Sequence, residues 1–166
     1  VAIIPKAISD NQWARASSTK AKQLRTNLLK CAFGPARKLR CVEILTACFY
    51  DPTRIDPTYA SAFRSFTQTR RMLMKNAQRK DRFMEDFLNA NRKTINVTGP
   101  VSGLQEAADL IGVKLSVANG VLTITNDDGN STTIDSNHKG HFNFIIRESI
   151  KRRIILQLQL RTTDSK

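Results

Sequence analysis

Cysteine and long apolar runs are both scarce in this chain of 166 residues. The three cysteines, Cys31, Cys41 and Cys48, form no CxxC pair. Their odd number argues against a disulfide scaffold and for a reducing compartment. No stretch reaches the roughly 18 consecutive apolar residues that a membrane-spanning helix needs, and the initial VAIIPKAI lacks the basic start of a signal peptide. We therefore predict an intracellular protein, cytoplasmic, nuclear or packaged in a virion, without a transmembrane segment.

Signatures of the common enzyme classes are also missing. The chain has no P-loop, no GxGxxG and no GxSxG. Its two histidines, His138 and His141, have only Asp135 close by in sequence, which falls short of the about four ligands of a zinc site. We predict no catalytic residues, no metal and no cofactor. One enzymatic alternative stays open, a basic ribonuclease or toxin domain in which His138 or His141 carries the proton with Glu148 or Asp135 as partner.

Acidic residues are few beside the basic ones. The chain holds 27 Lys and Arg against 14 Asp and Glu, which gives a net charge of +13 and a pI of about 10.2. Residues 1–94 carry 19 of the basic and 7 of the acidic residues, whereas residues 95–166 carry 8 and 7. Such an excess indicates a polyanionic partner, nucleic acid first and an anionic membrane second. The asymmetry predicts that the first part of the chain is the binding part.

The stretch from Asp56 to Lys93 has the pattern of one long amphipathic helix. Asp56 suits the N-cap and Pro57 the first helical position, and no further Gly or Pro occurs before Gly99. At about 100° per residue, one side collects apolar residues: Tyr59, Phe63, Phe66, Leu73, Ala77, Met84, Phe87 and Leu88. The opposite side collects five cations: Arg64, Arg71, Lys75, Arg79 and Arg82. A stripe of one charge is typical of a phosphate footprint, so we predict that these five bind nucleic acid.

Two helices are predicted before this stretch. The first begins near Ser9, which has capping-box spacing to Gln12, and ends at Gly34. Its mostly apolar face comprises Trp13, Ser17, Ala21, Leu24, Leu28 and Cys31. The second runs over residues 35–50 and places three cations, Arg37, Lys38 and Arg40, in its first turn. Cations oppose the macrodipole there, but free N–H groups beside them suit a phosphate. We therefore predict that this turn and the stripe form one basic groove.

The second half of the chain has the pattern of a small antiparallel sheet. Residues 94–103 mark a boundary, and Ser102 is expected to cap a helix that ends at Ile111. The strands VKLSV and VLTIT flank Asn119-Gly120, a pair typical of a type I′ hairpin turn. NDDGN is a second turn before a third strand, STTID, and residues 137–140 are predicted to form a loop.

Residues 142–160 fit two interpretations. They could form one continuous helix, or a helix to about Arg153 followed by a strand over ILQLQLR. The alternation of Leu156, Leu158 and Leu160 favours the strand.

Together these patterns predict an α+β protein. A basic helical part of three helices, one of them long, spans residues 1–94, and an α+β part with an antiparallel β-meander and flanking helices spans residues 95–166. The two parts are either separate domains or one packed unit. The chain begins with Val1, which fits a processed product or a fragment.

The expected function is non-enzymatic binding of nucleic acid, RNA more than DNA, through its phosphate backbone. The aromatic residues of the helices fall on apolar faces, which favours phosphate contact over base recognition. A packaging or nucleocapsid protein, or an accessory component of a ribonucleoprotein, of a virus or mobile element, would have these properties, with or without self-association. A structural protein on anionic membranes is the third alternative.

Overall fold

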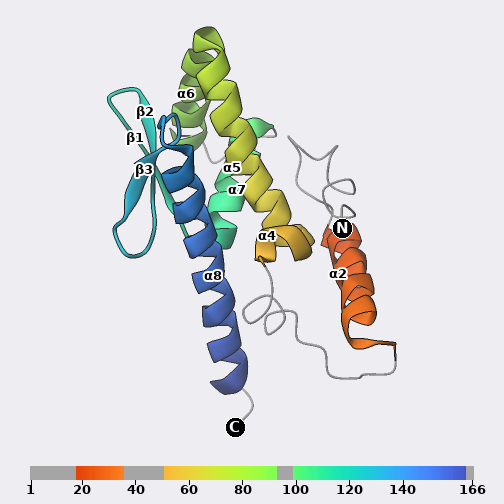
Figure 1. The fold of residues 1–166 in the computed structure, drawn as a ribbon. Helices are drawn as coiled ribbons and strands as arrows, with labels where there is room; N and C mark the ends of the chain where they lie inside the picture. Colours follow the sequence, from red (N-terminus) through yellow and green to blue (C-terminus); the bar gives the residue numbers. More distant parts are fainter. Residues whose placement is uncertain (1–17, 36–50, 93–98, 164–166) are drawn as a thin grey trace.

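The computed structural model describes residues 18–35, 51–92 and 99–163 (Figure 1). These ranges hold six helices: α2 (Ser18–Phe33), α4 (Pro52–Ile55), α5 (Pro57–Lys75), α6 (Ala77–Arg92), α7 (Pro100–Ile111) and α8 (Lys139–Thr163). They also hold three strands: β1 (Lys114–Ala118), β2 (Val121–Thr125) and β3 (Ser131–Thr133). The predicted α+β fold class is confirmed.

The sheet is an antiparallel meander in the order β1-β2-β3. Ala118 pairs with Val121 across the first turn, where Asn119 and Gly120 have φ angles of 53° and 71°. Positive φ at both central residues is what a type I′ turn requires, so the predicted hairpin is confirmed. Leu122 and Ile124 of β2 are buried, and the sheet therefore presents one face to the helices.

One hydrophobic core joins both halves of the chain. Its fully buried side chains come from α5, α6, α7, β2 and α8, and include Phe66, Phe87, Leu104, Ile124, Phe142 and Ile150. In Figure 1, α5 and α8 run on either side of α7, and the sheet lies along one flank. The core thus crosses the predicted boundary at residues 94–103, while the division into two domains stays a prediction.

Helix α2 packs on the beginning of α5 through a small separate contact. Leu24 and Leu28 lie against Ala60, and Arg25 forms an ion pair with Asp56. Cys31, which the pattern placed on the apolar face, is exposed. The expected start near Ser9 and nearly all of the predicted second helix lie outside the described residues.

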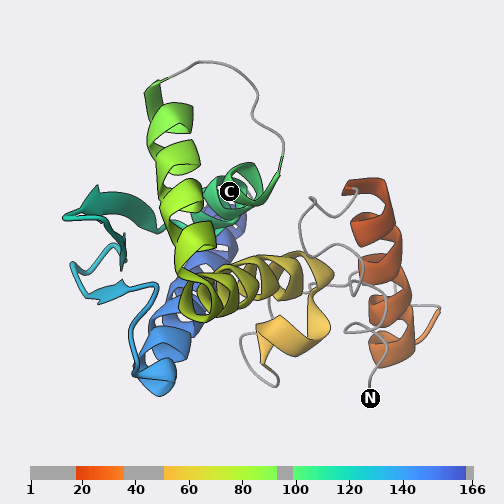
Figure 2. The same cartoon turned by 90° about the horizontal axis from the view of Figure 1, so that it is seen from above.

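The predicted single long helix is wrong, because the chain turns at Asn76. Asn76 has extended backbone angles of −148° and 109°, and its side-chain oxygen accepts a hydrogen bond from the N–H of Arg79. Asparagine is a strong N-cap, so it ends α5 and starts α6 without any Gly or Pro. Seen from above, α6 runs in a different direction from α5 (Figure 2). An unbroken helix of this length would extend about 54 Å, well beyond the core that both segments bury against.

The predicted phase of the two helices is confirmed for most positions. Tyr59, Phe66, Leu73 and Phe87 are buried, whereas Arg71 is exposed. Two apolar predictions are wrong, since Ala77 and Leu88 are exposed. The turn at Asn76 explains Ala77, because it resets the helical phase at the first residue of α6.

The C-terminal segment is one continuous helix, so the predicted strand over ILQLQLR is wrong. Ile154 is buried and Leu158 half-buried, whereas Leu156 and Leu160 are exposed. The far end of α8 extends past the sheet in Figure 1. A strand there would leave its backbone N–H and C=O groups without a neighbouring strand, whereas a helix satisfies them internally.

Two helix starts also differ from the prediction. Helix α7 begins at Pro100 with Gly99 as its N-cap, so Ser102 lies inside the helix and does not cap it. Proline at the first helical position has its φ already set for a helix. Helix α8 begins at Lys139, within the predicted loop of residues 137–140.

Candidate nucleic-acid interface

The solvent face of α5 carries charge of one sign only. The helix contains no Asp or Glu between Pro57 and Lys75. Arg64 is half-buried, and Arg71 and Lys75 are exposed. The three lie in one row, at separations of about 10 Å and 6 Å along the axis. Within the described residues, no carboxylate forms an ion pair with Arg71 or Lys75. We call Arg64, Arg71 and Lys75 the α5 row.

The stripe does not continue unchanged into α6. Arg79 and Arg82 are exposed as predicted, but they belong to a helix that turns away behind α5 (Figure 1). The exposed surface of α6 also carries three acids: Asp81, Glu85 and Asp86. The prediction of one straight stripe of five cations is therefore wrong, and of these two helices only α5 has an exposed surface of one charge sign.

Two arginines missed by the sequence reasoning lie where α5 and α8 meet. The guanidinium of Arg70 lies 5.6 Å from the centroid of the Phe142 ring, and that of Arg147 lies 5.3 Å from the centroid of Phe63. The later residue of α5, Arg70, contacts the earlier residue of α8, Phe142, and the earlier Phe63 contacts the later Arg147. The two helices therefore run antiparallel. Cation–π contacts of this kind hold a positive charge against an apolar surface. The helical pattern could not reveal them, because they depend on which helix packs beside α5.

Arg70 is the more buried of these two arginines. It is 8 % exposed, and its Nη2 donates a hydrogen bond of 2.6 Å to the carbonyl oxygen of Ser136. This bond connects the middle of α5 to the residues that lead into α8. It therefore fixes the α5 row beside the start of α8.

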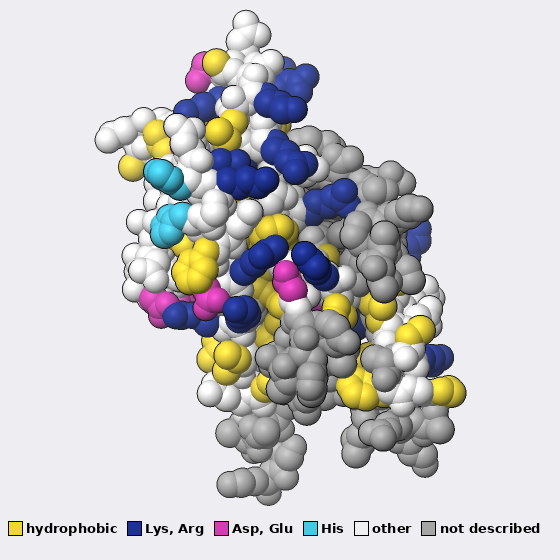
Figure 3. Space-filling view, in the orientation of Figure 1, with side chains coloured by type: hydrophobic (Ala, Val, Ile, Leu, Met, Phe, Trp, Pro, Cys, Tyr) yellow, Lys and Arg dark blue, Asp and Glu magenta, His cyan; other side chains and the backbone are white. Residues whose placement is uncertain are grey.

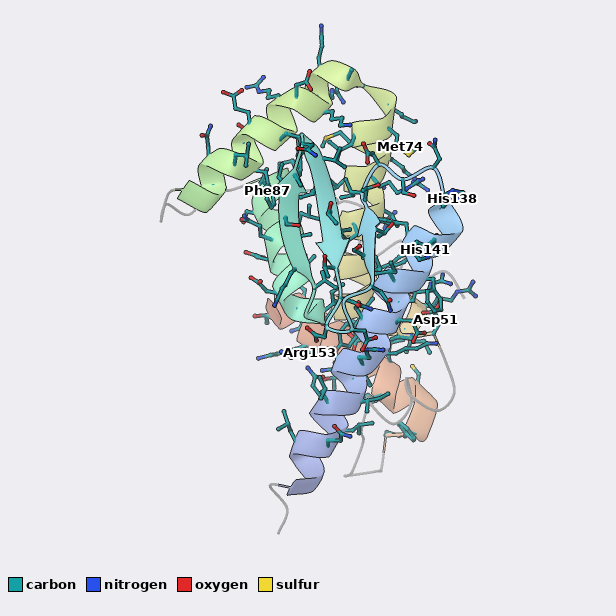
Figure 4. The ribbon with its side chains drawn as sticks, turned by 90° about the vertical axis from the view of Figure 1, so that its left-hand side faces the viewer. Asp51, Met74, Phe87, His138, His141 and Arg153 are labelled. Atoms are coloured by element: carbon teal, nitrogen blue, oxygen red, sulfur yellow. The ribbon has the colours of Figure 1, made fainter. Side chains whose placement is uncertain are left out.

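The beginning of α8 adds three exposed groups to the same face. His138, Lys139 and His141 are all exposed. Figure 4 shows both histidines at the edge of the molecule that also carries Met74 and Asp51. Figure 3 views this edge face-on, and there the two histidines adjoin a band of Lys and Arg side chains.

The acids nearest to this face are already bound by cations. Asp51 lies 3.5 Å from Arg147 and 4.0 Å from Arg54. Asp135 lies 2.7 Å from the Nζ of Lys80, and this hydrogen bond and charge hold the pKa of Asp135 below its usual range. The net potential of the face is therefore positive.

The geometry around the histidines does not form a proton-transfer pair. Asp135 is bound by Lys80 and Glu148 by Lys151, at 2.7 Å and 3.0 Å. Neither histidine bonds to either carboxylate in the described part of the chain. The described residues also contain no group of three or more His, Cys, Asp and Glu that could hold a metal ion.

The predicted turn with Arg37, Lys38 and Arg40 lies outside the described residues, so the single-groove model stays a prediction. Helix α2 supplies further cations. Its exposed lysines are Lys20, Lys22 and Lys30, and it contains no acidic residue.

Comparisons with protein-family models, with curated proteins and with solved structures find no match to this chain. Within the residues described, no helix is both long enough and apolar enough to cross a membrane.

Proposed function

We propose that this protein binds nucleic acid, RNA more than DNA, by contacts between its Lys and Arg side chains and the phosphate backbone. The observation that carries the proposal is the α5 row, which is purely cationic in a helix without acids. Arg147 adds an exposed cation on α8 beside this surface, and the buried Arg70 holds the start of α8 against α5 through its hydrogen bond to Ser136. Packaging of RNA, or an accessory role in a ribonucleoprotein, is the biological setting that fits such sequence-independent contact.

A solvated helix face would have a different composition. Like charges one helical turn apart destabilise an isolated helix by about 0.2–0.5 kcal/mol per pair, and opposite charges stabilise it by a similar amount. Lys75 is the last residue of α5, where the helix macrodipole stabilises a cation. Arg64 and Arg71 lie farther from the C-terminus and gain no such stabilisation. A polyanion on this surface would supply a counter-charge for Arg71 and Lys75.

The test is a salt titration of RNA binding, measured by fluorescence anisotropy with a labelled RNA of mixed sequence. With six to ten phosphate contacts, affinity should fall about 10³–10⁵-fold between 50 and 200 mM salt. The slope of log affinity against log salt concentration should become shallower by about 0.7 for each phosphate contact with a single strand that is removed. An affinity that does not depend on salt would refute the proposal.

A matched pair of variants localises the contact. Lys75→Gln removes one cation from the α5 row, and Lys114→Gln removes one exposed lysine from β1. We expect a lower affinity and a smaller salt slope for Lys75→Gln, equally for all RNA sequences, and no change for Lys114→Gln. Equal effects of the two changes would mean that only total charge matters.

The same incubation distinguishes the other functions. RNA that stays intact supports binding, whereas cleavage that disappears in His141→Ala would favour a ribonuclease. Binding to anionic liposomes that RNA does not displace would favour a membrane-surface protein.

A further inference from the structure

Phe144 is an aromatic side chain that α8 presents to solvent. It is 59 % exposed, whereas Phe66, Phe87 and Phe142 are at most 1 % exposed. Single exposed apolar residues are common on protein surfaces, so exposure alone has no functional meaning. The surroundings of Phe144 give it one.

Phe144 lies between cationic or titratable groups on its own helix. Positions three apart lie on the same side of a helix, so His141 precedes Phe144 by about one turn and Arg147 follows it by one. His141 and Arg147 are both exposed. The carboxylate of Glu148, one turn on, is bound by Lys151 at 3.0 Å. The ring of Phe144 is therefore flanked by an imidazole and by two cations, Arg147 and Lys151, with their carboxylate partners Asp51 and Glu148.

The antiparallel packing of α5 and α8 places this ring beside the α5 row. Arg147 contacts Phe63, and Arg70 contacts Phe142, so the segment of α8 that carries Phe144 runs alongside residues 63–70 of α5. In Figure 3, hydrophobic surface adjoins the two histidines on the face that carries the band of Lys and Arg. In this helix pair, α5 carries the row of cations and α8 carries the exposed aromatic ring.

We infer that Phe144, with His141 beside it, is a stacking platform for unpaired bases, and that the ligand of this face is single-stranded RNA. The inference rests on the proposed function and specifies its substrate class. The phosphates would lie along the α5 row while a base stacks on Phe144. Single-strand binders combine a cationic track with aromatic rings in this way, and stacking tolerates any base because each has a π-face. A duplex keeps its bases stacked internally and cannot offer them to a side chain.

Charge complementarity selects this occupant over an apolar partner. Arg71 and Lys75, which form no ion pair within the described residues, would lose their hydration against an apolar surface without gaining a counter-charge. A polynucleotide supplies both an anionic backbone and flat aromatic bases, which are the two features that this surface can bind.

The experiment compares a labelled single-stranded RNA of roughly 12 nucleotides, within the usual site sizes, with a blunt duplex of the same length at one salt concentration. Phe144→Ala should weaken single-strand binding by about 5- to 150-fold, the range expected for the loss of one stacked base. Its affinity for the duplex and its salt slope should not change. Phe144→Tyr, which keeps the ring, should bind as the original protein does.

Leu160→Ala is the matched control, because Leu160 is 63 % exposed on the same helix but lies about 24 Å farther along its axis than Phe144. We expect it to leave RNA binding unchanged. Far-ultraviolet circular dichroism and thermal melting of each variant check that the fold is retained.

The outcomes separate this inference from the function on which it rests. If RNA binds with a steep salt slope but Phe144→Ala binds single strand and duplex as before, the stacking platform is refuted and the backbone contact stands. An equal loss for single strand and duplex also refutes stacking. If no RNA binds at any salt concentration, the proposed function itself fails. If the protein binds anionic liposomes, loses that binding in Phe144→Ala, and is not displaced from the liposomes by single-stranded RNA, the inference is overturned in favour of a lipid surface.

Discussion

Asp56 connects α2 to α5, and its replacement is the sharpest test of how these two helices are held together. Its Oδ1 accepts a hydrogen bond of 2.9 Å from the N–H of Thr58, which makes it the N-cap of α5. Its Oδ2 lies 2.9 Å from Nη2 of Arg25 in α2. The side chain of Asp56 is 0 % exposed and that of Arg25 is 31 % exposed. One carboxylate therefore caps α5 and anchors α2.

The expected cost follows from these two roles. Loss of an N-cap to alanine costs about 1 kcal/mol. Removing one partner of a fully buried ion pair costs about 3–5 kcal/mol, but Arg25 can regain water and lowers that figure. We expect Asp56→Ala to reduce the free energy of unfolding by about 2–3 kcal/mol, a large share of the about 5–15 kcal/mol of a typical domain. Asp56→Asn keeps a capping oxygen and should cost about 1 kcal/mol less, by the same cap value.

The burial difference predicts an asymmetry between the partners. Arg25→Gln leaves a fully buried carboxylate without its cation, whereas Asp56→Asn leaves a guanidinium that reaches solvent. Arg25→Gln should therefore be the more destabilising of these two changes. Combining them should cost less than the sum of the single changes, because the unpaired charge is removed.

Urea unfolding followed by circular dichroism measures each variant, with midpoint and slope fitted separately. A cost below about 0.5 kcal/mol for Asp56→Ala, the usual range of a surface substitution, would refute the reasoning. So would additive costs in the double variant, since they would show that the ion pair contributes nothing.

Three further changes test other features. Asn76→Ala removes the cap of α6 and should lower the free energy of unfolding by about 1 kcal/mol in urea titrations, whereas a gain would mean that one continuous helix is preferred. The pKa of Asp135 is held low by Lys80, so the pair stabilises the fold above the unfolded-state pKa of about 4 and stops doing so as pH falls through the lower folded-state pKa. The melting temperature, measured from neutral to acidic pH, should therefore fall less steeply for Asp135→Asn than for the original protein, and parallel curves would contradict this. Ile154→Ala should cost about 2–5 kcal/mol and Leu160→Ala under about 0.5 kcal/mol. Equal costs in urea unfolding would contradict a helical α8 with one buried side.

Local patterns in the sequence determined several features by themselves. Asp56 followed by Pro57 predicts the start of α5, and Asn119 followed by Gly120 predicts the hairpin, because each pair has a strong backbone preference over a few residues. The apolar period also places Phe66 and Leu73 correctly in the core. The cationic face of α5 follows from the same period, since whatever is opposite the core lies in water.

Other features were decided by tertiary packing. Asn76 could have continued a helix, but a turn there lets both apolar faces reach one core of limited size. The segment with Leu156 and Leu160 alternates like a strand, yet none of the strands in the described ranges lies beside it to accept its hydrogen bonds. The tertiary arrangement of the chain, and not the residue pattern, therefore determines that this segment is helical.

The candidate interface divides in the same way. Arg71 and Lys75 could be predicted, since exposure on an amphipathic helix is a local property. Arg70, Arg147 and Phe144 could not, because their roles depend on α8 lying antiparallel to α5. Residues about 80 positions apart in the chain become neighbours only through burial of a shared core, and such contacts leave no period in the sequence for a reader to detect.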